Sequence, residues 1–133
     1  MQRTENEFAE FWVQEGILYF VYKQGAVINL EAAKQIVVER LALQAGVAYP
    51  VLCDLRGIRD SDKPGRDYLA REGSELCKAV GALVESPVTK VMVNFYMKID
   101  RPRTPTQMFT SKDDALLYLQ AYIDRDTVPQ KAP

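Results

Sequence analysis

The segment YPVLCDLRGIRDSDKPGR, residues 49–66, decides the fold, because an apolar run in it ends in a polar loop that opens a helix. The run Val51–Cys53 has strand length and is typical of the centre of a parallel sheet that is covered on both faces. Asp54 marks the carboxyl end of that strand. Open α/β sheets bind ligands beyond the carboxyl ends of their strands, so we expect function in the loop from Arg56 to Lys63.

The residues before this segment predict a hairpin and a long helix. Residues Phe8–Val13 and Ile17–Tyr22 are rich in aromatic and β-branched side chains, and the Glu-Gly pair between them indicates an antiparallel turn. Asn29 stands at the N-cap position before the apolar pattern of residues 30–44, which predicts a helix. Gly46 is placed to end that helix in the left-handed conformation.

The residues after the loop predict a second helix and another strand. Pro64 suits the first helical turn, with Ser61 or Asp62 as the cap before it, and the helical pattern continues toward Cys77. The small and branched residues Ala79–Val84 then predict a short buried strand.

The last third of the chain predicts two more helices and one strand. Ser86 followed by proline is typical of a helix start and favours a third helix. The apolar residues after it fit the two-residue period of a strand almost as well as the period of a helix. Two prolines in residues 100–105 indicate a connection. Residues Thr106–Phe109 predict a final strand, and Ser111 with Asp114 forms a capping box for the fourth helix. We expect Phe109 to pack against that helix near Leu116.

Together these elements predict a single α/β domain. Their alternation favours a mostly parallel sheet with an N-terminal antiparallel hairpin and four helices on its faces. We assign residues 1–133 to this one domain, with an ordered core of about 8–124. A chain of this length buries roughly two thirds of its unfolded surface, so its core needs neither metal nor disulfide.

The amino-acid composition limits the classes of partner that the protein can bind and indicates its cellular compartment. Seventeen basic and eighteen acidic residues leave a net charge of −1, which provides no attraction to nucleic acid or to anionic membranes. The apolar runs are too short to span a membrane, and the start of the chain has no signal-peptide core. We therefore expect a cytoplasmic protein, in which Cys53 and Cys77 are reduced core residues.

Residue types argue against an enzyme and against a resident cofactor. The chain has no histidine, and it lacks a phosphate loop, a dinucleotide-binding glycine motif and a nucleophile elbow. Asp54, Asp60 and Asp62 resemble a divalent-metal cluster of a receiver domain. That type of site also needs an acidic pair after the first strand and a lysine after the last, and both are missing. We therefore interpret the three carboxylates as solvated loop groups beside Arg56 and Arg59 and expect no metal site.

The strand VLCDL leading to Asp60 and Ser61, together with the ending TPTQMFTSKDDALLYL, resembles a bacterial STAS-like domain of the SpoIIAA-like group. The ending is most similar to a set of uncharacterised small STAS-like proteins. The characterised members that the chain resembles are anti-sigma factor antagonists, which bind a partner kinase or switch protein. They are regulated by phosphorylation of a serine in an Asp-Ser loop, and this resemblance implies the same role for Ser61. A serine before a helix is more often only a cap, so both interpretations stand.

These observations predict a non-enzymatic regulatory or protein-binding module without a cofactor. The alternative is a carrier that holds a small lipid-like or anionic ligand between sheet and helices. The expected partner is a protein, with a homodimer as a further option and with nucleic acid and membranes excluded. We expect the binding edge at the strand ends and helix starts, with Ser61 as the switch residue; it comprises Asp54, Arg56, Arg59, Asp60, Ser61, Lys63, Ser86 and Ser111.

Overall fold

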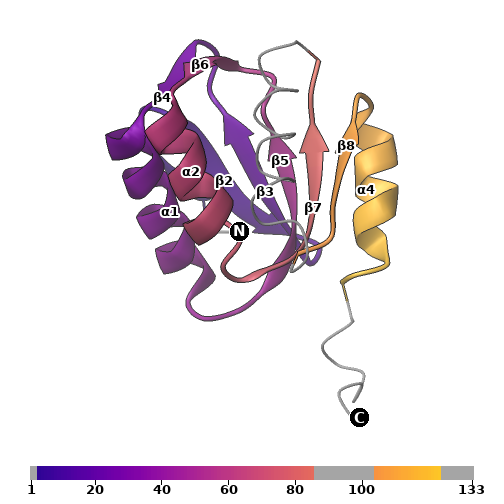
Figure 1. Cartoon of the computed structure of the whole chain (residues 1–133). Helices are drawn as coiled ribbons and strands as arrows, with labels where there is room; N and C mark the ends of the chain where they lie inside the picture. The colour runs from indigo at the N-terminus through magenta and orange to yellow at the C-terminus, as the bar shows by residue number, and fades with distance from the viewer. Residues whose placement is uncertain (1–2, 86–103, 124–133) are drawn as a thin grey trace.

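A computed structural model describes residues 3–85 and 104–123 of the chain (Figure 1). Its strands are β1 (Arg3–Glu5), β2 (Ala9–Gln14), β3 (Ile17–Tyr22), β4 (Ala26–Ile28), β5 (Tyr49–Asp54), β6 (Ile58–Ser61), β7 (Cys77–Leu83) and β8 (Thr106–Phe109). Its helices are α1 (Leu30–Gln44), α2 (Lys63–Glu72) and α4 (Lys112–Gln120). Three of the four predicted helices therefore lie among the described residues. The helix predicted to start at Ser86 lies outside them.

The main sheet is mostly parallel, as the sequence predicts. Its six described strands run in the order β1-β2-β3-β5-β7-β8. The β1, β2 and β3 strands pair antiparallel, whereas β3, β5, β7 and β8 pair parallel. The predicted hairpin of β2 and β3 is thus confirmed, and β5 lies between β3 and β7 at the centre of the sheet.

Helices cover both faces of this sheet. Figure 1 shows α1 and α2 side by side on one face and α4 on the other. Successive residues of a strand point to opposite faces, so Val51 packs into the core beneath α1 whereas Leu52 packs with Leu119 of α4. Burial on both faces explains why the central strand reads as a continuous apolar run rather than as an alternating one.

The helix caps follow local chemistry closely. The Asn29 side-chain oxygen accepts the N–H of Ala32 at 2.9 Å, and the Ser111 hydroxyl accepts the N–H of Asp114 at 3.3 Å, which confirms both predicted caps. At the end of α1, Ala45 already has a φ of 49° and Gly46 one of 83°. The left-handed turn predicted at Gly46 therefore begins one residue earlier.

The predicted end of the second helix is wrong. The α2 helix stops at Glu72, where the N–H of Gly73 bonds to the carbonyl of Leu69 at 2.9 Å. Cys77, expected at the end of the helix, instead begins β7 and pairs with Tyr49 of β5. Pairing with a strand that is distant in sequence outweighs the helical pattern of these residues.

Three short strands were not predicted. The β1 strand precedes the ordered core expected from the sequence and adds an antiparallel edge to β2. The β4 and β6 strands form a separate two-stranded parallel sheet, so the expected loop from Arg56 to Lys63 contains a strand. Strands of three or four residues carry too few side chains for a periodic pattern, and only the partner strand stabilises them.

Candidate functional site

The carboxylate at the end of β5 shapes a turn. Both oxygens of Asp54 accept from the guanidinium of Arg56, with Nε to Oδ1 and Nη2 to Oδ2 distances of 2.9 Å each. The backbone N–H of Arg56 donates to Asp54 Oδ1 at 3.0 Å. The hydrogen bond with Asp54 raises the pKa of Arg56. Asp54 is therefore engaged within its own turn, which directs the chain out of the main sheet toward β6.

The next residues seat β6 against β4. A Cβ on Gly57 would lie 2.6 Å from the carbonyl oxygen of Lys23, which is closer than a real Cβ approaches, so only glycine fits there. The carbonyl of Gly57 accepts the N–H of Gly25 at 2.8 Å. The segment from Arg59 to Asp62 is therefore held on a rigid backbone, although Arg59 and Asp60 are exposed.

Ser61 ends β6 immediately before α2. Its backbone N–H donates to Asp60 Oδ1 at 2.8 Å. Arg66 Nη1 donates to the carbonyl of Ser61 at 3.0 Å and to its hydroxyl at 3.2 Å. The cap of α2 is Asp62, whose carboxylate accepts the N–H of Gly65 at 2.9 Å. Of the two predicted caps Asp62 is right, so Ser61 has no capping role and its hydroxyl faces an arginine.

The start of α2 is fixed to the small sheet. The N–H of Asp62 bonds to the carbonyl of Ile28 at 3.1 Å, and a Cβ on Gly65 would come within 2.8 Å of the same oxygen. On the exposed side of this first turn, Lys63 pairs with Asp67 at 3.1 Å. The rim of the molecule around Ser61 therefore combines a stiff backbone with exposed charged side chains.

The predicted binding edge is divided between two faces of the sheet. Ser61 leads into α2, and Ser111 caps α4 on the opposite face, although both lie at the end of the sheet to which β5 and β7 point (Figure 1). Ser86 lies outside the described residues. The structure brings together the predicted residues of the α2 side, which are Asp54, Arg56, Arg59, Asp60, Ser61 and Lys63.

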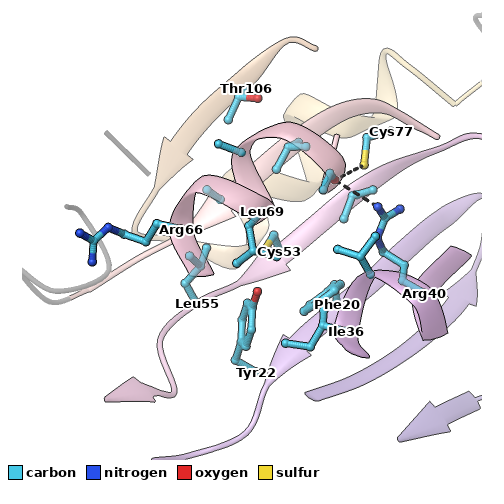
Figure 2. A pocket seen from close by; sticks show the side chains of 16 residues that line it. Phe20, Tyr22, Ile36, Arg40, Cys53, Leu55, Arg66, Leu69, Cys77 and Thr106 are labelled. Carbon is cyan, nitrogen blue, oxygen red and sulfur yellow. Dashed lines mark hydrogen bonds between the residues drawn. The ribbon is translucent and has the colours of Figure 1, made fainter. Parts of the chain in front are cut away.

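The structure also contains a cavity that the sequence did not predict. It has a volume of about 110 Å³ and lies between the sheet and helices α1 and α2 (Figure 2). Aromatic and aliphatic side chains form most of its described wall, including Phe20, Ile36 and Leu69. Arg40 of α1 also lines it and is only 2% exposed.

Arg40 connects α1 to the loop between α2 and β7. Its Nη1 donates to the carbonyl of Glu75 at 3.1 Å and to the side-chain oxygen of Gln44, and its Nη2 donates to the carbonyl of Gly73 at 3.1 Å. Gln44 in turn donates to the carbonyls of Val47 and Leu76, at 2.9 Å each. Ile36, Arg40 and Gln44 are spaced four residues apart, so they lie on one face of α1. A pattern of apolar residues alone does not include Arg40 and Gln44 in the buried face, because both side chains are polar.

Both cysteines of the chain line the same cavity and are free thiols. Burial, followed by the negative charge of Asp54, raises the pKa of the Cys53 thiol to about 12. Burial also raises the pKa of the Cys77 thiol. The thiolate is the reactive form, so neither residue has the chemistry of a catalytic nucleophile.

Alkylation of Cys53 should therefore be slow in the native protein. A raised pKa keeps the thiol protonated, so the labelling rate should continue to rise up to about pH 12, whereas an ordinary cysteine levels off above about pH 8.5. The measurement is the iodoacetamide rate at Cys53 against pH, followed by peptide mass spectrometry. The same protein in urea is the control and should show the ordinary profile. A native rate that levels off near pH 9 would contradict the burial of this thiol.

Two properties of the described residues bear on other functions. No group of three or more histidine, cysteine or acidic residues is arranged there to hold a metal ion. No helix within residues 3–85 and 104–123 is long and apolar enough to cross a membrane.

Comparisons with known proteins agree on the fold. A family model described as a domain of unknown function (DUF7793) matches residues 11–123. The chain is similar to an anti-sigma factor antagonist from Mycobacterium paratuberculosis, with 18% identity, a TM-score of 0.65, and coverage of 84% of this chain and 92% of that one. It is also similar to an uncharacterised DUF3478-family protein with a SpoIIAA-like fold from Shewanella loihica PV-4, with 15% identity, a TM-score of 0.60, and coverage of 87% and 98%. No curated protein matches significantly. The fold is therefore SpoIIAA-like, as the resemblance implied.

Proposed function

Because this chain belongs to the DUF7793 family, whose function is unknown, and has a SpoIIAA-like fold, we propose that it is a non-enzymatic regulatory module that binds another protein. The docking surface is the rim around the start of α2, where Arg59, Asp60 and Lys63 are exposed. The partner is a kinase or switch protein, by analogy with the anti-sigma factor antagonist of the same fold.

One observation carries the proposal. The exposed charged side chains of this rim project from a backbone segment that is fixed at both ends. At one end Gly57 packs closely against the carbonyl of Lys23, and at the other the N–H of Asp62 bonds to the carbonyl of Ile28. A surface that is ordered before binding loses little conformational entropy on association, and its alternating charges favour a partner of complementary pattern. Loops that serve only as connections do not need such rigid support.

The contact between Ser61 and Arg66 supports a role for Ser61 as the switch. A phosphate on this hydroxyl would add close to two negative charges beside a guanidinium that already contacts the oxygen at 3.2 Å. Arg59 and Lys63 lie on the same rim. The modification would therefore make the docking surface strongly negative while the buried core stays unchanged.

Ser61→Asp should weaken binding of the partner by about tenfold or more, since charge changes at a docking surface alter both steering and contacts. The partner is first identified by pull-down from the source cells and then purified. Its affinity is measured by calorimetry for wild type, Ser61→Ala and Ser61→Asp.

Ser74 is the matched control for this experiment. It follows the opposite end of α2 and its hydroxyl donates to the carbonyl of Arg71 at 3.3 Å. Ser74→Asp introduces the same charge away from the rim and should leave the affinity within about twofold. If Ser74→Asp weakens binding and both Ser61 variants leave it unchanged, the docking surface lies elsewhere.

The cavity beneath α1 and α2 favours the alternative of a ligand carrier, but its size limits the ligand. Sites for drug-sized ligands enclose about 300–1,000 Å³. A cavity of about 110 Å³ is too small for a lipid chain. A lipid carrier is therefore not the function that the described residues support, and we keep protein binding as the primary proposal.

A further inference from the structure

The cavity is lined by a buried cation that has no carboxylate partner among the described residues. Arg40 is 2% exposed, and the acceptors of its three hydrogen bonds are all neutral oxygens. A guanidinium has five N–H groups, so two of them have no acceptor among the described residues. No carboxylate of residues 3–85 or 104–123 forms an ion pair with Arg40. Buried charges are normally paired, so Arg40 is an exception that needs an explanation.

The end of α2 compensates only part of this charge. The carbonyl of Gly73 belongs to the C-terminus of the helix, where the dipole corresponds to about half a negative charge. This contact explains how the folded chain holds Arg40 in place. The rest of the positive charge of Arg40 stays uncompensated at the cavity wall, and a bound monoanion would neutralise it.

A second unused donor faces the same space. Tyr22 is 5% exposed, and Figure 2 shows its hydroxyl pointing into the cavity. This hydroxyl has no hydrogen-bond partner among the described residues. Burial raises the pKa of Tyr22 well above its ordinary value, so the phenol keeps its proton and can donate it. A ligand that accepts from this hydroxyl would gain a hydrogen bond in a mostly apolar space.

The rest of the described wall is mostly apolar and contains no competing acceptor with a negative charge. The described lining residues include no aspartate or glutamate. Both thiols stay protonated, and the Thr106 hydroxyl is already bonded to the carbonyl of Thr104 at 3.0 Å. Arg66 also lines the cavity, but Figure 2 shows its guanidinium pointing away. The cavity thus combines an apolar body with hydrogen-bond donors.

We propose that this cavity is a binding site for a small carboxylate with a short apolar chain, held by the free N–H groups of Arg40 and by the Tyr22 hydroxyl. The apolar chain packs against Phe20, Ile36 and Leu69. An engineered cavity of about 150 Å³ accommodates benzene, so a cavity of about 110 Å³ suits a ligand of about six non-hydrogen atoms. This site is separate from the proposed docking surface, so either assignment can fail without the other.

Butyrate is the probe, and butyramide is its neutral counterpart of equal size. Butyrate should raise the melting temperature of the full chain in a saturable manner, by mass action on the folded state. It should also shift the side-chain Nε–H resonance of Arg40 in ¹⁵N NMR spectra. Butyramide should bind about tenfold or more weakly, because hydrogen bonds to charged groups contribute more than neutral ones.

Two variants test the site without removing Arg40. Tyr22→Phe deletes the donor and keeps the ring, and it should weaken butyrate binding about tenfold. Tyr19→Phe is its matched control, because Tyr19 lies on the same strand but packs on the α4 side of the sheet, and binding should be unchanged. Cys53→Leu fills part of the cavity and should abolish binding. Equal binding of butyrate and butyramide, binding that survives Cys53→Leu, or an Arg40 resonance that does not move would each overturn the proposal.

Discussion

Leu52→Ala should lower the free energy of unfolding by about 3–5 kcal/mol, because it removes a fully buried side chain from the central strand and leaves a cavity. Leu52 is 1% exposed and packs with Ile17, Ala79 and Leu119, which come from three different elements. No single neighbour can close the gap, because the surrounding backbone belongs to paired strands. Urea denaturation followed by circular dichroism measures the change.

Leu117→Ala is the matched control for this experiment. Leu117 lies on α4 and is 74% exposed, so the same chemical change should alter stability by no more than about 0.5 kcal/mol. A loss below about 1 kcal/mol for Leu52→Ala would mean that α4 does not cover the sheet as described.

Arg40→Met should destabilise the protein by about 2–4 kcal/mol, since the buried Gln44 side chain and the carbonyls of Gly73 and Glu75 all lose a charged donor. Methionine retains most of the apolar stem, so the loss reports the hydrogen bonds more than the packing. Removal of a buried charge that has no ion-pair partner stabilises the protein. The net decrease in the free energy of unfolding is therefore smaller than the summed contributions of the lost hydrogen bonds.

Arg71→Met provides the comparison for Arg40→Met. Arg71 is exposed in the last turn of α2, so its replacement should change the free energy of unfolding by less than about 1 kcal/mol. Chemical denaturation of both variants gives the two values. If Arg40→Met matches Arg71→Met, the loop between α2 and β7 is held by other contacts.

Elements with strong local patterns were predicted correctly. The hairpin of β2 and β3, the buried run of β5 and the caps at Asn29 and Ser111 all depend on residues within a few positions of one another. The predicted packing of Phe109 on the last helix is confirmed in kind, because its ring lies 5.3 Å from that of Tyr118. Leu116, the residue named for that contact, lies in the same cluster.

The candidate sites were predicted less completely. The sequence indicated the segment around Ser61, because strand ends and helix starts are readable, but it did not reveal that Arg66 contacts the serine hydroxyl. The cavity was missed altogether. Its described wall combines residues from α1, α2 and four strands of the main sheet, and no local pattern reports how well such distant side chains fill space.

The class of fold, the position of the central strand and the N-caps of α1 and α4 follow from local sequence, because hydrophobic periodicity and capping act over a few residues. Three further features depend on tertiary contacts: where α2 ends, the pairing of β6 with β4, and the cavity that both Arg40 and Tyr22 line. These outcomes depend on hydrogen bonds and packing between segments far apart in the chain. The energies of such contacts exceed local preferences and leave no periodic trace in the sequence.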